Sequence, residues 1–290
     1  MKFRAFTSKL LVLFMILSMV LLPGVNKVYA DAYKVVTLGG DLTDKQKNDM
    51  MEYFKVNKQE ANVIEVNIDE EKKYLGDVAS SEQIGTKSIS CAYVEPTSSG
   101  GLNVSTNNIY WVSSSMIKNA LITAGIKNAN VKAAAPFNVS GTAALTGILK
   151  GFENSTGGTK ISEETKKVAN DELVTTGNLG DKIGKDQAAG LINEIKTEVV
   201  KENPKTEGEI KTIVQNVVNN YNVNLTSEDI NKIVSLMSKI NGLNLNFSDL
   251  KDQLNNVASQ LKGSISSEEA KGFFARIIEA IKNFFASFSK

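Results

Sequence analysis

The hydrophobic pattern of this 290-residue chain changes near residue 153, and this change constrains the fold more than any other feature. Between Tyr33 and Phe152, short β-branched runs alternate with segments whose apolar residues recur at helical spacing. After Thr159, every periodic segment has helical spacing. We therefore expect an α/β (or α+β) N-terminal domain with a mixed sheet of about five strands, followed by an all-α helical region.

Five segments before residue 153 have the composition of strands, and turn or capping residues separate them from helices. Thr43 followed by Gln46 has the spacing of a capping box, which predicts that a helix begins there. Ile89, Cys91 and Tyr93 alternate, so we expect them to share one face of a strand. The loop 96–101, rich in Ser and Gly, predicts a hairpin between the strands on either side of it. The expected strands are 33–38, 61–68, 88–95, 102–112 and 129–137.

Residues 1–30 have the pattern of an export signal. Basic residues come first, a mostly apolar run follows at 10–22, and Val28-Tyr29-Ala30 has the small residues that signal peptidase recognises. A run of about a dozen apolar residues is shorter than the roughly 20 that span a membrane. We expect cleavage near Ala30 and a secreted or extracytoplasmic protein associated with the cell envelope.

Composition excludes several classes of function. Histidine is absent from the sequence, which excludes Ser-His-Asp and Cys-His catalysis and His-ligated metals. The lone Cys91 excludes an intramolecular disulfide, and we expect it to be an inert core thiol. From residue 31 onward the net charge is −3, which gives no footprint of nucleic-acid binding. No motif indicates a metal or cofactor.

The linker between the two patterns lies at 153–159, where Asn, Ser, Thr and Gly dominate. The expected organisation is a signal peptide at 1–30, an α/β domain at 31–153, a helical bundle region at 154–263 and an amphipathic C-terminal helix at 264–290. Within the bundle region, Thr206 and Glu209 form a second capping box after the helix-breaking Pro204.

Several motifs resemble a known family. They include Val36-Thr37-Leu38-Gly39, Tyr74-Leu75-Gly76, Asn108-Ile109-Tyr110-Trp111-Val112 and the long run from Ala133 to Gly147. Together they are similar to the YpuA-like family of secreted proteins from Gram-positive bacteria, a domain of unknown function. The resemblance continues through Glu172-Leu173-Val174 and 204–207, so it spans most of the chain. It implies export and an envelope setting, and it supplies no catalytic residues.

Ser115 and Lys118 match the S-x-x-K spacing at an expected helix start. In penicillin-binding enzymes this spacing lets the lysine activate the serine hydroxyl. The companion K-T-G motif is absent, and serine is also favoured at helix starts simply as a cap. The capping interpretation is therefore preferred. Carboxylates near the expected strand ends are a second route to hydrolysis, but no pair among them stands out.

Ser140, Gly141 and Thr142 connect an expected strand to an expected helix. Backbone amides at such a start can cradle an anion, which makes this turn a candidate ligand or anion pocket. No lysine follows in phosphate-loop spacing, so nucleotide binding is not indicated. Tight packing of small residues is the simpler interpretation.

The C-terminal segment carries an apolar stripe at helical spacing. Such a stripe can dock onto the bundle, occupy the groove of a partner or lie in a membrane interface. Burial of each large apolar side chain is worth roughly 1.5–3 kcal/mol, so we expect the stripe to be covered. The candidate membrane or partner contacts are Phe273, Phe274, Ile277, Ile278, Ile281, Phe284, Phe285 and Phe288.

These observations favour an exported, non-catalytic binding or accessory protein of the envelope. The expected partner is a membrane surface, a wall polymer or another envelope protein, without nucleic acid or cofactor. A cell-wall hydrolase that uses carboxylates or the Ser115–Lys118 pair is the first alternative. A structural interaction arm, held by a rigid α/β domain, is the second. The sequence leaves the oligomeric state open.

Overall fold

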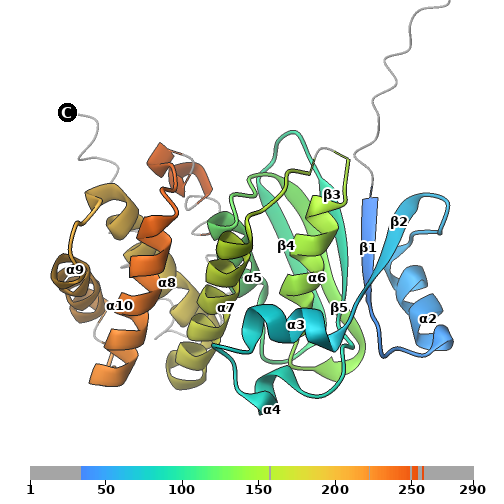
Figure 1. The fold of residues 1–290 in the computed structure, drawn as a ribbon, viewed down its shortest axis with the longest axis horizontal. Helices are drawn as coiled ribbons and strands as arrows, with labels where there is room; N and C mark the ends of the chain where they lie inside the picture. The colour runs from blue at the N-terminus through green and yellow to red at the C-terminus, as the bar shows by residue number, and fades with distance from the viewer. Residues whose placement is uncertain (1–33, 157, 222, 249, 254–256, 258–290) are drawn as a thin grey trace, which may run out of the picture. The chain divides into compact units, whose positions relative to one another are not determined.

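The computed structural model describes residues 34–156, 158–221, 223–248, 250–253 and 257, and within them it contains a five-stranded mixed sheet (Figure 1). The strands run in the order β2-β1-β3-β5-β4. The two outer pairs, β1 with β2 and β4 with β5, are parallel, whereas β3 is antiparallel to both of its neighbours. The fold class expected from the sequence is confirmed. The strands are β1 Lys34–Gly39, β2 Ala61–Val66, β3 Cys91–Pro96, β4 Leu102–Ile109 and β5 Ala129–Val139.

The expected hairpin between the third and fourth strands is wrong. β3 and β4 follow each other in sequence, but β5 lies between them and pairs with both. β5 supplies Ala133, Ala134 and Ala135, all of which are buried, so it suits a position covered on both faces. β4 alternates between buried and exposed residues and occupies the edge of the sheet.

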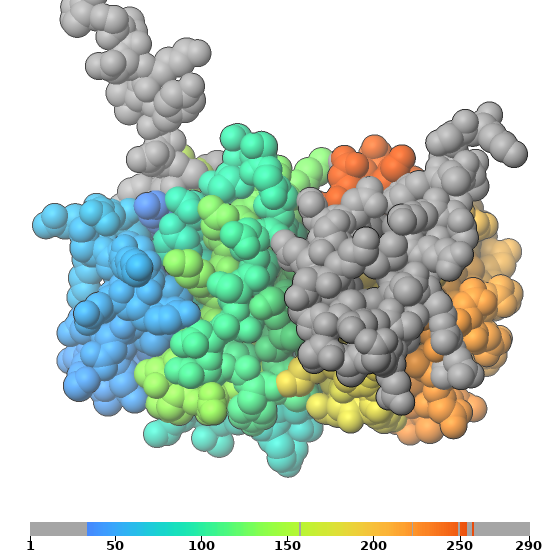
Figure 2. Space-filling view, turned by 180° about the vertical axis from the view of Figure 1, so that it is seen from behind, coloured from blue at the N-terminus to red at the C-terminus, as the bar shows by residue number. Residues whose placement is uncertain are grey.

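One face of the sheet is covered by α2 (Asp44–Phe54), which contacts β1 and β5. The Thr43–Gln46 capping box begins this helix as predicted. Cys91 and Tyr93 pack on this side of the sheet, and Ile89 packs against the same cluster. Burial raises the pKa of the Cys91 thiol to about 11, so the thiolate is disfavoured. In the space-filling view from behind, the blue surface of α2 and its neighbouring strands adjoins the green central part of the sheet (Figure 2).

The opposite face is covered by helices from three places in the chain. α6 (Thr142–Glu153) packs on β3, β1 and β2, and α5 (Ser114–Thr123) packs on β4. α3 (Ile68–Leu75) contacts α6 and leads into the short α4 (Ser81–Ile84). The sequence pattern did not predict α3, because charged residues fill most of its eight positions.

The remaining described helices form a bundle. α7 (Glu163–Ile183), α8 (Lys185–Glu202), α9 (Glu207–Tyr221) and α10 (Ser227–Gly242) contact one another in sequence order, and α10 also returns to α7 and α8 (Figure 1). α7 and α8 additionally contact α5, the helix that lies on β4.

The sheet and the bundle share one hydrophobic cluster, which includes Val131 of β5 and Leu173 of α7. Gly177 of α7 allows a close approach, because a Cβ at this position would lie 2.3 Å from Cζ2 of Trp111. The indole Nε1 of Trp111 donates a hydrogen bond to Oδ2 of Asp181 at 3.1 Å. α7 is thereby anchored to the end of β4. The division of the chain at residue 153 into two domains stays a prediction.

Candidate functional site

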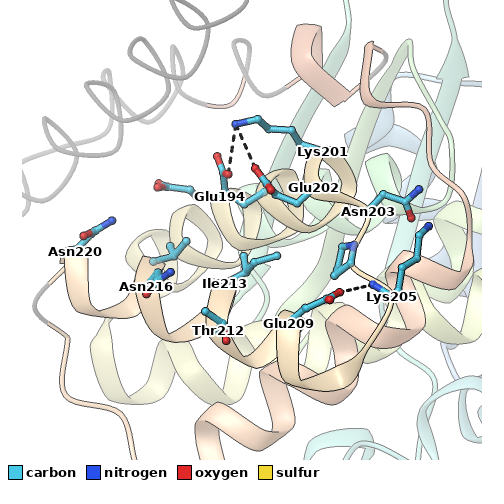
Figure 3. Close-up of a pocket in the computed structure, with 13 residues that line it drawn as sticks. Glu194, Lys201, Glu202, Asn203, Lys205, Glu209, Thr212, Ile213, Asn216 and Asn220 are labelled. Atoms are coloured by element: carbon cyan, nitrogen blue, oxygen red, sulfur yellow. Dashed lines mark hydrogen bonds and ion pairs between the residues drawn. The ribbon is translucent and has the colours of Figure 1, made fainter.

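A groove of about 980 Å³ lies between α8 and α9, and charged and amide side chains line it (Figure 3). The wall formed by α8 carries Glu194, Glu198 and Glu202, which are spaced four residues apart on one side of the helix. The wall formed by α9 carries Thr212, Asn216 and Asn220 at the same spacing. Residues four apart lie about 6 Å apart along a helix axis, so two parallel polar rows line the groove.

The turn that creates the groove is determined by local sequence. Asn203 takes a left-handed conformation with φ of 47° and ends α8, and Pro204 follows it. The Thr206 hydroxyl then accepts a hydrogen bond from the Glu209 amide at 3.2 Å, and the Glu209 carboxylate accepts one from the Thr206 amide at 3.3 Å. This capping box begins α9 as the sequence predicted. The chain therefore reverses direction within four residues, which brings α9 alongside α8.

Glu194 is the most unusual residue of the groove. Only 9% of it is exposed, and its Oε2 atom makes no hydrogen bond within the described part of the chain. Burial, and then the negative charge of Glu198, raise the pKa of Glu194 to about 8. An unpaired carboxyl in this setting holds its proton near neutral pH and takes up a cationic or hydrogen-bonding partner readily.

The outer part of the same row is more open and carries its own counter-charge. Lys201 Nζ lies 3.7 Å from Glu198 Oε2 and 3.7 Å from Glu202 Oε1 (Figure 3). Burial also raises the pKa of Glu198; Glu202 adds to this effect and Lys201 opposes it. Four glutamates and two lysines line the groove, so it is acidic when all of them are ionised.

Ser115 and Lys118 lie on α5, away from the lining of this groove. The Ser115 hydroxyl donates a hydrogen bond to Oδ1 of Asp186 at 3.0 Å, and Ser113 caps the helix by accepting from the Met116 amide at 3.3 Å. Lys118 is 3% exposed, and burial lowers its pKa to about 8. The Ser115 hydroxyl is thus hydrogen-bonded to the Asp186 carboxylate of α8.

Ser140, Gly141 and Thr142 form the start of α6, as expected. The hydroxyls of Ser140 and Thr142 both donate to the backbone oxygen of Gln83, at 3.0 and 3.2 Å. Gly141 has φ of +94°, and a Cβ there would lie 2.3 Å from Cγ2 of Ile109. The turn is closely covered by α4 and β4, and an anion pocket at this place stays a prediction.

The predicted C-terminal contact residues and the predicted signal peptide lie outside the described residues. The contact residues concerned are Phe273, Phe274, Ile277, Ile278, Ile281, Phe284, Phe285 and Phe288.

A buried ion pair was missed by sequence reasoning. Lys196 of α8 and Glu172 of α7 are both completely buried, with Nζ 2.7 Å from Oε1. Lys196 also donates to the Thr123 hydroxyl and to the Asn119 backbone oxygen, both at 3.0 Å. Burial lowers the pKa of Lys196, and Glu172 counteracts this. The sequence carried one indication that Lys196 is buried: it lies four residues after Ile192 on the apolar face of α8.

Glu71, one of the carboxylates near the expected strand ends, is a second buried carboxyl, and its burial was not predicted from the sequence. It is completely buried on α3, and neither of its oxygens makes a hydrogen bond within the described residues. Burial raises its pKa to about 7; the Asp41 carboxylate adds to the rise, and the neighbouring Ser88 hydroxyl opposes it. Its spacing from Ile68 and Leu75, on one side of α3, could have indicated burial.

The described residues contain no group of three or more His, Cys, Asp or Glu side chains placed to hold a metal ion. The carboxylates of the groove are spread along α8 instead of converging on one point. A search of the same described residues for helices of sufficient length and hydrophobicity to cross a bilayer found none.

Comparisons with known proteins agree with the motifs of the sequence. The model of a family described as "Protein of unknown function (DUF1002)" matches residues 38–257. "Uncharacterized protein YpuA" of Bacillus subtilis (strain 168) is 41% identical over 247 residues, which are 84% of each of the two chains. No solved structure matches this chain. The resemblance to the YpuA-like family is confirmed.

Proposed function

This chain belongs to the DUF1002 family, whose function is unknown, and from its own residues we propose that it is an exported, non-catalytic binding protein of the bacterial cell envelope. Its ligand site is the groove between α8 and α9. One observation carries this assignment: Glu194 is nine-tenths buried, lines the groove and has one oxygen without a hydrogen bond to any described residue. A buried acceptor without a partner costs free energy, which a ligand that supplies the missing partner recovers.

Export rests on residues 1–30, where a basic start, an apolar run and Val28-Tyr29-Ala30 follow one another. Expression of the full chain in a Gram-positive host, followed by N-terminal sequencing, tests it. We expect the medium and envelope fractions to contain a product that begins at Asp31. A double variant, Leu13→Arg with Ile16→Arg, interrupts the apolar run and should stay in the cytoplasm. An uncleaved wild-type product in the cytoplasm would contradict export.

Envelope binding is measured by co-sedimentation of residues 31–290 with purified cell walls and with anionic liposomes. Binding to walls that is lost in Glu194→Gln supports the groove as the site. Binding to liposomes that is lost in a Phe284→Ser, Phe288→Ser double variant instead assigns attachment to the C-terminal stripe. Sedimentation with neither material would refute an envelope-binding role.

A hydrolase is the second candidate, because Glu194 and Glu198 are neighbouring carboxyls with raised pKa values in an open groove. Glycosidases use such a pair as acid and base or nucleophile, on opposite sides of the scissile bond. Here both carboxyls belong to one face of one helix, which favours binding over cleavage. Release of reducing sugars from purified walls, abolished in Glu194→Gln, would establish the hydrolase instead.

A further inference from the structure

The charge pattern of the α8/α9 groove indicates which ligands fit it. Its α8 wall presents three carboxylates over two helical turns, and its α9 wall presents the Glu209 carboxylate and the neutral side-chain oxygens of Thr212, Asn216 and Asn220, so hydrogen-bond acceptors line both sides. The innermost carboxylate, Glu194, is nine-tenths buried, and its Oε2 atom has no hydrogen bond in the part of the chain that the structure describes. The complementary ligand has several positive hydrogen-bond donors arranged in a row.

The spacing of the carboxylates separates this ligand from a metal ion. A divalent cation requires several oxygens within about 2.0–2.6 Å of one point. Carboxylates on successive turns of α8 are centred about 6 Å apart, and no metal-holding group is found among the described residues. A chain with a positive charge at intervals of a few ångströms can contact each carboxylate in turn. The groove volume of about 980 Å³ is that of a small-molecule site.

We propose that the α8/α9 groove binds a linear alkyl polyamine, whose ammonium groups pair with Glu194, Glu198 and Glu202. An ammonium group has three N–H donors and no acceptor, so the neutral oxygens of Thr212, Asn216 and Asn220 can complete its hydrogen bonds. The alkyl segments lie against Ile213 and Val217, the apolar residues in the lining of the groove. This inference rests on the proposed function and names the class of ligand.

Lys201 acts as an internal competitor in this arrangement. Its ammonium group lies within 4 Å of both Glu198 and Glu202, in the position that a ligand ammonium would occupy. The ion pairs of the described residues do not include Glu194, and burial, followed by the negative charge of Glu198, raises its pKa. The ligand is therefore expected to displace Lys201 at the open end and to gain a new partner at the closed end.

Because Glu194 is titratable, the affinity of the groove for a cation should depend on pH in a definite direction. The other titratable groups that line the groove with Glu194 are Glu198, Lys201 and Glu202 of α8, Lys205 of the turn and Glu209 of α9. Since the pKa of Glu194 is about 8, most of this carboxyl is protonated at pH 6 and about half is ionised at pH 8. A cation binds the ionised form, so its affinity rises with pH. A neutral ligand that accepts the Glu194 proton shows the opposite trend.

Isothermal titration of residues 31–290 with spermidine, at about 0.15 M ionic strength, tests the proposal. Alkyl ammonium groups ordinarily titrate near pH 10, so the terminal groups of the probe stay charged between pH 6 and pH 8. We expect the affinity for spermidine to increase by at least about tenfold from pH 6 to pH 8, because a larger fraction of Glu194 is then ionised and able to bind a cation. Equal or stronger binding at pH 6 would overturn the proposal.

Three substitutions sharpen the test at pH 8. Glu194→Gln should weaken spermidine binding by about tenfold or more, because it removes the buried charge at the closed end. Lys201→Gln should strengthen binding a few-fold, because it removes the competitor. The control Glu52→Gln removes an equal charge from the exposed surface of α2 and should change nothing. Unchanged affinity in Glu194→Gln, with the variant folded by circular dichroism, would refute the site.

Retention on cell walls is measured with the same proteins, so that failure of the polyamine proposal can be distinguished from failure of the proposed function. Wall binding without spermidine binding refutes the polyamine and leaves the proposed function standing. If the wild-type chain binds neither cell walls nor spermidine, both the proposed function and the polyamine proposal are refuted. Wall binding that spermidine displaces, and that Glu194→Gln loses, supports both.

Discussion

Glu71 on α3 and Glu172 on α7 are both completely buried carboxyls, yet their surroundings differ. Glu172 receives the Lys196 ammonium at 2.7 Å and a hydrogen bond from the Thr123 hydroxyl. Glu71 has no hydrogen bond within the described residues, and its pKa is raised to about 7. The comparison shows that burial alone does not determine the charge of a carboxyl. The bundle accommodates an ion pair at Glu172, whereas the surroundings of Glu71 on α3 favour the protonated acid.

Glu194 differs from both, because it lines a groove. Within the described residues, its carboxyl resembles Glu71 in lacking a partner for an oxygen and in having a raised pKa, but Glu194 lies in the lining of a groove. Its position at the groove, rather than the size of the pKa shift, therefore distinguishes the candidate site from the other buried acid.

Removing the counter-charge in the bundle should have the largest effect on stability. Lys196→Met leaves Glu172 buried without its ammonium partner, and breaking a buried pair in this way costs about 3–5 kcal/mol. Urea denaturation at pH 7 measures the loss.

A matched double variant tests the cause. Lys196→Met with Glu172→Leu replaces the whole pair by apolar side chains and should recover most of the lost stability. If the double variant were no more stable than Lys196→Met, packing of the Lys196 stem would explain the loss, and the contrast with Glu71 would fail.

Glu71→Gln should have a smaller effect that depends on pH. The folded-state pKa of Glu71, about 7, lies above the ordinary value of 4.5, so the native protein holds the proton more tightly. This contribution is fully present below pH 4.5 and is lost as the pH rises to about 7. A shift of this size corresponds to roughly 3 kcal/mol at most.

The variant should remove this slope and match the wild type near pH 4.5. Near pH 8 it should be more stable by about 1–2 kcal/mol, less than the full amount because a buried amide also lacks partners. Urea midpoints from pH 4.5 to 8 measure the difference. A wild-type slope that persists in Glu71→Gln would assign the titration to another group.

Sequence reasoning succeeded where local interactions decide the structure. The capping boxes at Thr43 and Thr206, and the stripes of α5, α6 and α8–α10, are determined by residues within one or two turns. It failed for α7, whose apolar stripe is diluted by buried polar residues such as Asn170, Glu172 and Thr176. The hairpin between β3 and β4 failed because strand order is set by packing of distant segments.

The groove could not be predicted from the sequence for the same reason. Its two walls are each visible as helices in the sequence, but only the turn at Asn203 and Pro204 aligns the Glu194 row with the row of Thr212 and Asn216. The raised pKa of Glu194 then follows from burial that no sequence window shows. Ser115 and Ser140 matched motifs, but their partners, Asp186 and Gln83, come from other elements.

Glu194→Gln should alter the stability of the protein over the widest range of pH. The folded-state pKa of about 8 again lies above 4.5, so the stabilising effect of the protonated form is lost as the pH rises from about 4.5 to 8. The pKa shift of Glu194 is larger than that of Glu71, so at pH 9 the variant should exceed the wild type in stability by at least as much as Glu71→Gln does near pH 8. Thermal unfolding at pH 5, 7 and 9 measures it, with Glu52→Gln as the control. A gain clearly smaller than that of Glu71→Gln would mean that Glu194 titrates well below pH 8, and the pH dependence expected for ligand binding in the groove would be lost.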